Sequence, residues 1–294
     1  MKNKKNFIIR IITGICLMAV MIPSIIIGGI FYLCVTTFLT TIGTYELMNM
    51  FYKKNPCLKV MRFIMPIFSG LTMVSFYFGC NNNVLMLPLL LFGLGVVTSM
   101  LFGLLKDGTE ASDIMSCITS ITYAGLLLSM AFSVEFLKPI GYNETESSSY
   151  FGKVFIFLYS NVIFTDVFAY FFGSLLGKHK LCEKISPKKS VEGAIFGLVL
   201  GAMVGTVLGL VLGVFPYQDV QNKVLLVILV YLLSLVISAT SQIGDLVASK
   251  LKRSYEIKDY GFIFPGHGGV MDRFDSLIIS GSLLFIIMNI ISRF

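Results

Sequence analysis

The stretch AIFGLVLGAMVGTVLGLVLGVF, residues 194–215, decides the fold. It contains no charged residue, and a helix of this length extends about 33 Å, enough to cross the hydrocarbon core of a bilayer. Glycine recurs at every fourth position, at Gly193, Gly197, Gly201, Gly205, Gly209 and Gly213. Small residues at this spacing let another helix approach closely. The pattern therefore predicts a membrane span with a helix-packing face, in preference to a ligand-binding face.

Apolar blocks of similar length continue along the whole chain. Of the 294 residues, 56% are hydrophobic and only 13% are charged, whereas soluble domains carry about 25% charged residues. We expect an all-α integral membrane protein, a polytopic bundle of about nine transmembrane helices. The expected spans are residues 8–26, 29–50, 60–79, 83–104, 115–137, 151–174, 194–215, 224–243 and 276–292.

The N-terminal sequence and the cysteines are the two features that could indicate a secreted protein, and the details of both argue against it. The basic, then apolar start of the chain resembles a signal peptide, but no small-residue cleavage site follows and a second apolar block begins at once. The cysteines stand singly, without CxxC or Cys/His metal spacing. We expect packing residues and no disulfide or zinc framework at Cys16, Cys34, Cys57, Cys80, Cys117 and Cys182.

The net charge of +7 is best explained by membrane topology. All but four of the 23 Lys and Arg residues lie at the N-terminus or after even-numbered spans; the four are Lys138, Lys153, Lys223 and Arg293. Cytoplasmic loops carry the excess of bases. We therefore expect a multi-pass protein of a bacterial-type inner membrane, with the N-terminus and loops 177–193 and 244–275 cytoplasmic and no nucleic-acid partner. The short polar loop 141–150 would lie outside.

Residues 244–275 concentrate the chemistry of the chain. Ser234, Ser238, Ser241 and Asp245 follow helical spacing, continued by Ser249 and Lys252 if the helix extends past the membrane. After the turn Pro265-Gly266-His267-Gly268-Gly269, Asp272, Arg273 and Asp275 begin the ninth span. Asp245, Asp272 and Asp275 offer the hard oxygen ligands that Mg²⁺ prefers, usually together with phosphate oxygens. Helix capping by acids is the alternative.

Basic residues in both cytoplasmic loops indicate a phosphate-containing substrate. They supply donors for phosphate oxygens, although such clusters also attract anionic lipid. These bases are Lys178, Lys180, Lys184, Lys188, Lys189, Lys250, Lys252, Arg253, Lys258 and Arg273. His267, flanked by glycines, is a candidate for binding or orienting phosphate, and His179 for an exposed loop residue.

Two acids lie within other predicted spans. Asp166 shares one helix face with Tyr170, Gly173 and Gly177, a face that we expect to line a site. For Glu46, a helix-end acid near the cytoplasmic surface and a functional acid are equally acceptable interpretations.

The segment from Ser249 to Asp275 resembles the signature of phosphatidate cytidylyltransferases. The matching positions are Ser249, Leu251, Lys252-Arg253, Lys258-Asp259, Gly261, Phe264-Pro265, His267 to Val270 and Asp272 to Asp275. Asp166 with Ala169-Tyr170, Gly173 and Gly177-Lys178, and the run from Ser186 to Gly193, resemble two further segments of this family. Ser190 stands where the family more often has threonine. The resemblance is specific to the C-terminal half, so we expect N-terminal transmembrane helices over 1–150 and a catalytic transmembrane region over 151–294.

The resemblance implies the reaction CTP + phosphatidic acid → CDP-diacylglycerol + pyrophosphate, in phospholipid biosynthesis. It also implies Mg²⁺, with or without a second cation, and a homodimer. The catalytic candidates are Asp245, Asp272, Lys252, Arg253, His267 and Arg273, and the metal candidates are Asp245, Asp272 and Asp275. The substrate-binding candidates are Asp166, Tyr170, Ser186, Lys188, Lys189, Glu192, Lys258, Gly268 and Gly269.

Two alternatives remain open. The first is a related lipid nucleotidyltransferase or a CTP-dependent polyprenol kinase, which would use similar cationic loops. The second is a membrane transporter, suggested by the many spans and intramembrane acids. The chain shows no internal repeat of the kind that transporters often have, and its charged loops lie at one membrane face, which favours the enzyme.

Overall fold

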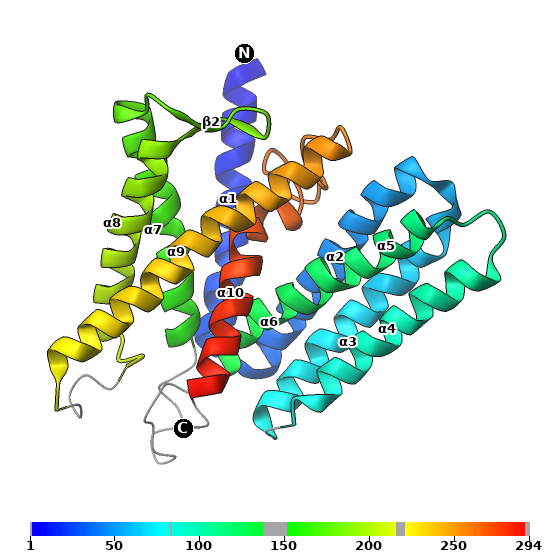
Figure 1. Ribbon diagram of the computed structural model, residues 1–294, viewed down its shortest axis with the longest axis horizontal. Helices are drawn as coiled ribbons and strands as arrows, with labels where there is room; N and C mark the ends of the chain where they lie inside the picture. Colours follow the sequence, from blue (N-terminus) through cyan, green and yellow to red (C-terminus); the bar gives the residue numbers. More distant parts are fainter. Residues whose placement is uncertain (1, 83, 138–151, 216–220, 292–294) are drawn as a thin grey trace. The chain divides into compact units, whose positions relative to one another are not determined.

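The computed structural model describes residues 2–82, 84–137, 152–215 and 221–291 (Figure 1). The outer loop expected at 141–150, with Lys138 and Arg293, lies outside these residues. The helical segments are α1 (Lys2–Ile27), α2 (Gly29–Lys54), η1 (Pro56–Lys59), α3 (Met61–Asn81), α4 (Met86–Leu105), α5 (Ala111–Ser120), the π-helix η2 (Ile121–Leu127), α6 (Leu128–Ser133), η3 (Val134–Phe136), α7 (Lys153–Leu176), α8 (Val191–Val211), α9 (Lys223–Ser254) and α10 (Met271–Ile291).

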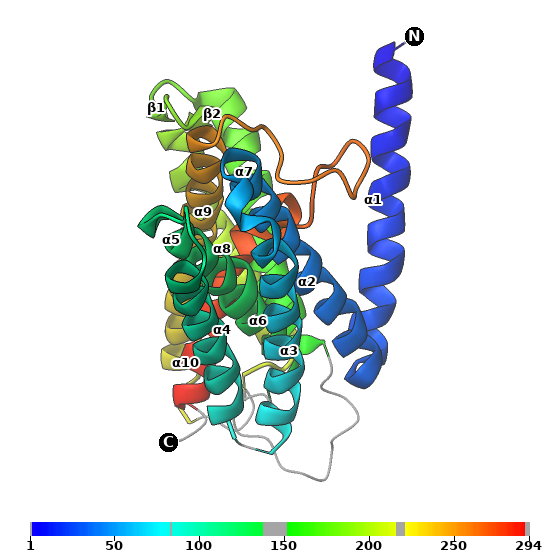
Figure 2. The same ribbon diagram turned by 90° about the vertical axis from the view of Figure 1, so that its right-hand side faces the viewer.

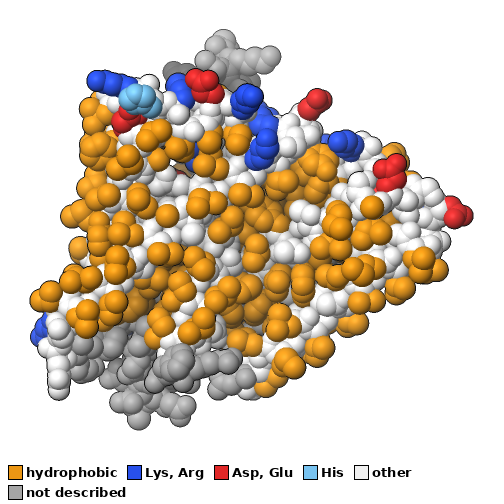
Figure 3. All heavy atoms as spheres, viewed as in Figure 1, with side chains coloured by type: hydrophobic (Ala, Val, Ile, Leu, Met, Phe, Trp, Pro, Cys, Tyr) orange, Lys and Arg blue, Asp and Glu red, His pale blue; other side chains and the backbone are white. Residues whose placement is uncertain are grey.

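Within the described ranges, eight helical segments are long and apolar enough to cross a membrane. The first expected span corresponds to α1, whose apolar part, Ile12–Ile27, is shorter than the others. Hydrophobic side chains cover most of the face drawn in Figure 3, as expected for helices that contact lipid. The prediction of an all-α, multi-pass membrane protein is confirmed.

The chain divides into two compact units. The first comprises Met1–Ser133 and Lys252–Phe274, and the second comprises Val134–Leu251 and Asp275–Phe294. The polar segment 252–274 therefore groups with the N-terminal helices, whereas the sequence suggested a boundary at residue 150. Helices α9 and α10 each contribute to both units.

In the first unit, α3 packs between α2 and α4 (Figure 1). Tyr32, fully buried on α2, donates from its hydroxyl to the Phe132 carbonyl at 2.9 Å. The Phe132 ring meets the Phe274 ring edge-on at 5.1 Å. Aromatic pairs of this geometry add stability beyond the area that they bury. The contact between Phe132 and Phe274 holds the end of the polar segment 252–274 against the core of this unit.

In the second unit, α7 and α8 lie side by side (Figure 1). The glycine ladder of α8 is the contact surface, because a Cβ added at Gly197 would overlap Ala169 and one added at Gly201 would overlap the Thr165 backbone. Gly205 faces Asn161 in the same way. The predicted packing face is confirmed, and its partner is a helix of the same chain.

The polar loop between α7 and α8 contains a β-hairpin that the sequence did not predict. Its strands β1 (Lys180–Cys182) and β2 (Ser186–Ser190) pair antiparallel, with Lys180 opposite Ser190. Ser190 also begins α8, where its hydroxyl accepts from the Gly193 amide at 3.2 Å. This cap fixes the end of the strand against the start of the helix.

Candidate active site

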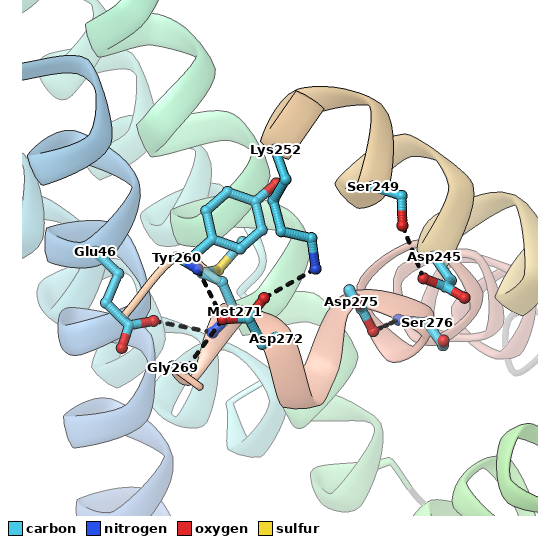
Figure 4. A network of polar contacts seen from close by, with 10 residues as sticks. All are labelled: Glu46, Asp245, Ser249, Lys252, Tyr260, Gly269, Met271, Asp272, Asp275 and Ser276. Carbon is cyan, nitrogen blue, oxygen red and sulfur yellow. Dashed lines mark hydrogen bonds and ion pairs between the residues drawn. The ribbon is translucent and has the colours of Figure 1, made fainter. Parts of the chain in front are cut away.

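Asp272, in the first turn of α10, is a buried acid that accepts hydrogen bonds from three donors. It is 8% exposed. Its Oδ1 accepts from Lys252 Nζ at 2.8 Å, and its Oδ2 accepts from the backbone amides of Tyr260 and Gly269 at 2.7 and 3.0 Å (Figure 4). A buried carboxylate is tolerated when charge and donors compensate it in this way. Asp272 and Lys252, which the sequence assigned to metal and to phosphate binding, therefore form an ion pair with each other.

The turn before Asp272 is tight because glycines occupy its left-handed positions. Gly266 and Gly268 have φ values of 76° and 84°, which only glycine adopts without strain. The Phe264 amide donates to the Gly268 carbonyl at 2.9 Å, and the His267 amide donates to the Phe264 carbonyl at 2.8 Å. A side chain at Gly268 would also meet the Asp272 carboxylate.

The imidazole of His267 is held by α1, which runs beside the turn (Figure 2). Its Nδ1 lies 2.7 Å from Thr13 Oγ1, and Thr13 Oγ1 also lies 3.0 Å from the Pro265 carbonyl oxygen. Either ring tautomer can satisfy the first contact. The expectation that His267 binds phosphate stays a prediction.

An apolar cavity of about 560 Å³ borders the same turn. Thr13 is its polar edge, and its walls come from α1, α2, the turn and the start of α10. The volume is within the range of roughly 300–1,000 Å³ that is usual for ligand sites. Its lining includes Cys16, Val20, Cys34, Phe38, Phe264 and Phe274.

The second unit contains a polar pocket of about 310 Å³. Lys189 forms an ion pair with Asp245 Oδ2, and Ser249 Oγ lies 3.3 Å from Asp245 Oδ1. Five of the predicted catalytic, metal-binding or substrate-binding residues line this pocket together: Asp166, Tyr170, Lys188, Lys189 and Asp245. Asp166, Tyr170 and Gly173 of the predicted α7 face thus line one pocket, and the role of that face in a functional site stays a prediction.

The hairpin between α7 and α8 carries the lysines of this pocket. Glu192 is not in the lining but accepts from the Lys178 amide at 3.1 Å and contacts His179 Nδ1 at 2.6 Å. It ties the segment entering the hairpin to the first turn of α8. His179 is exposed, as expected. Gln242 of α9, which the sequence did not single out, lines the pocket and donates to the Ala194 carbonyl at 3.1 Å.

The remaining candidates are not among the residues that line the polar pocket. Arg253, Lys258 and Arg273 are exposed, and Ser186 lies half-buried on β2. Asp275 Oδ1 accepts from the Ser276 amide at 2.9 Å (Figure 4).

Two carboxylates, Asp272 and Asp245, are each neutralised by a lysine. Across the described ranges, no three His, Cys, Asp or Glu side chains cluster closely enough to form a metal site. Mg²⁺ commonly takes one or two carboxylates, with water and substrate phosphate supplying its other ligands. The carboxylates present therefore fit a magnesium ion that arrives bound to a phosphate. They do not fit a metal site in which the protein supplies all the ligands.

Comparison with known proteins identifies the family. Residues 8–291 match the model of the cytidylyltransferase family. The chain belongs to the cytidylyltransferase family. Three relatives named phosphatidate cytidylyltransferase, from Staphylococcus epidermidis, Bacillus subtilis and Staphylococcus saprophyticus, are 30%, 30% and 33% identical to it. Each alignment covers 95–96% of this chain and 98% of the relative. In this cytidylyltransferase the similarity thus includes the N-terminal helices, for which the sequence alone offered only a hydrophobic pattern.

Proposed function

We propose that this chain is a phosphatidate cytidylyltransferase, which converts CTP and phosphatidic acid into CDP-diacylglycerol and pyrophosphate. The observation that carries the proposal is the near full-length similarity to relatives of that name. The polar clusters at Asp272 and at Asp245 supply the mixture of acids and bases that such a reaction needs.

The reaction requires little covalent chemistry from the protein. A phosphate oxygen of phosphatidate attacks the α-phosphorus of CTP, the bond from that phosphorus to the oxygen bridging it to the β-phosphorus breaks, and pyrophosphate leaves. Catalysis is then mainly positioning and neutralisation of charge. Lys188, Lys189, Lys252, Arg253 and Arg273 are the proposed phosphate-binding residues.

Magnesium remains part of the proposal, with Asp245, Asp272 and Asp275 as candidate ligands. A bound divalent ion would neutralise charge on the triphosphate and on the departing pyrophosphate. Lys252 and Lys189, which hold two of these carboxylates in place, would turn toward phosphate oxygens when substrate binds. Each lysine would keep an anionic partner in this exchange, so the exchange would leave neither lysine charge uncompensated.

The apolar cavity beside the His267 turn supports a lipid as the second substrate. Its walls include the parts of α1 and α2 that are apolar enough to lie in the bilayer. A phosphatidate whose headgroup reaches the turn has acyl chains that extend to this depth. The setting that we propose is the bacterial inner membrane, with both polar loops cytoplasmic. The homodimer is proposed from the family resemblance alone.

The test is an assay of the purified protein with phosphatidic acid, Mg²⁺ and CTP labelled at either the α or the γ position. We expect α-label to appear in CDP-diacylglycerol and γ-label to appear in pyrophosphate. Transfer of γ-label into lipid would instead identify a kinase. Failure of both labels to enter any product with active, folded protein would contradict the proposal.

A further inference from the structure

Glu46 is a buried acid of the spanning helix α2 that the proposed reaction does not use. Only 6% of it is exposed. Acids within membrane spans are costly and usually have a partner or a function. The surroundings of Glu46 show which function it has.

The carboxylate of Glu46 lies against residues 261–271, which belong to the polar segment 252–274. Its Oε2 accepts from the Met271 amide at 3.1 Å (Figure 4). The backbone at Gly261 and at Gly269 approaches so closely that an added Cβ at either position would overlap the carboxylate. One turn earlier on α2, a Cβ at Gly43 would lie 3.2 Å from the Met271 sulfur, a tight contact, and 3.6 Å from Val270. The face of α2 that carries Gly43 and Glu46 therefore packs against residues 261–271.

Met271 is the first residue of α10, so its amide is one of the helix N-terminal donors that have no partner within the helix. A carboxylate at this end is also favoured by the helix dipole. Glu46 thus caps α10 from another helix, while Asp272 binds the amides of Tyr260 and Gly269 from within α10. The segment is held between two carboxylates.

We infer that Glu46 is a positioning residue, which fixes the segment 261–271 on α2 so that Asp272 and Lys252 keep the geometry needed for nucleotidyl transfer. The inference rests on the proposed function for its kinetic readout, and it assigns Glu46 no contact with either substrate. It also assigns a role to Gly261 and Gly269: they make room for an internal carboxylate.

The first experiment tests whether the length of the Glu46 side chain, which lets its oxygen accept a hydrogen bond, or its negative charge is what matters. Glu46→Gln keeps an acceptor oxygen at the same distance but loses the charge, whereas Glu46→Asp keeps the charge but is one methylene too short. We expect Gln to retain turnover within about threefold of wild type, and Asp and Ala to lower kcat about ten- to a hundredfold, with the KM for CTP little changed. Asp107→Asn, at an exposed acid of the same unit, is the control.

Two outcomes would overturn the inference: wild-type kcat in Glu46→Ala, or higher activity in Glu46→Asp than in Glu46→Gln. The latter order would mean that charge matters and reach does not. Absence of product from the wild-type protein would count against the proposed function, and the stability experiment that follows would still test the contact.

A thermal-unfolding cycle tests the contact independently of activity. Gly261→Ala should lower the unfolding midpoint of the detergent-solubilised protein, because its Cβ would overlap Glu46. The same change in the Glu46→Ala background should lower the midpoint no further, because the space is then open. Gly93→Ala, at a helix glycine with nothing within 4 Å of an added Cβ, should be harmless in both backgrounds. Additive effects of Gly261→Ala and Glu46→Ala would refute the contact.

Discussion

The Asp272 carboxylate illustrates how one residue serves both the fold and the proposed reaction. Three donors surround it, and its side chain and that of Lys252 are only 3% and 12% exposed. Asp272→Asn should lower CDP-diacylglycerol formation at least about a hundredfold, because the negative charge is lost. It should also lower the free energy of unfolding by on the order of 3 kcal/mol, because the buried ion pair with Lys252 is broken.

A second substitution separates these two effects. Asp272→Asn combined with Lys252→Met removes both charges of the pair, so no buried charge is left unpaired; this double variant should recover part of the thermal stability without recovering activity. Asp107→Asn serves as the matched control, and insertion of each variant is checked by membrane fractionation. Near-wild-type turnover in stable Asp272→Asn protein would remove Asp272 from the proposed mechanism.

Lys189 in the second unit corresponds to Lys252 in the first, because it pairs with a carboxylate, that of Asp245, in the polar pocket. Lys189→Ala should lower kcat/KM for CTP about tenfold or more, since a charge-assisted contact to phosphate is lost. Lys184→Ala is the comparison, because Lys184 is exposed in the turn of the same hairpin and outside the pocket lining. Equal losses in the two variants would mean that only the overall positive charge of the hairpin matters.

At the scale of elements, the pocket in the second unit depends on the pairing of α7 with α8. Gly201 faces the Thr165 backbone, one residue from Asp166, and the Thr165 hydroxyl donates to Ser238 Oγ at 2.9 Å. Gly201→Leu should separate the helices and lower the free energy of unfolding by about 1–3 kcal/mol or more. Thermal unfolding in detergent measures this, with Met203→Leu on the exposed face of α8 as control. An unchanged midpoint in Gly201→Leu would contradict the tight packing.

The helices could be predicted from the sequence because length, hydropathy and glycine spacing are local properties. The polar stripe of Ser234, Ser238, Ser241 and Asp245 allowed the helix to continue past the membrane to Lys252, and α9 does continue to Ser254, beyond the expected span of 224–243. The hairpin at 180–190 was missed because both strands are too short and too polar for a two-residue hydrophobic period. The π-helix at 121–127 has no corresponding sequence signal, since its apolar pattern is also that of an α-helix.

The residues of the candidate site could be predicted from the sequence. The residues that they contact in the fold were harder to predict. Asp166, Tyr170, Lys188, Lys189 and Asp245 were named from motifs, and the structure places them around one pocket. Gly268 and Gly269 were predicted to bind substrate, and this stays a prediction. Gly261 and Gly269 also make room for Glu46, which lies more than 200 residues earlier in the chain. Periodicity identifies the face on which a residue lies, but it does not identify a partner from a distant helix.

At the scale of the whole molecule, the distribution of bases predicts the orientation in the membrane. Lys188, Lys189, Lys252, Arg253 and Arg273 all lie on the side predicted to be cytoplasmic, where CTP is available. Nine crossings from a cytoplasmic N-terminus would place Phe294 outside. Alkaline phosphatase fused after Phe294 should therefore be active, because it folds only in the periplasm, whereas a fusion within 183–185 should be inactive. Activity of the hairpin fusion, with an inactive C-terminal fusion, would reverse the orientation and place both proposed phosphate-binding clusters on the side opposite to CTP.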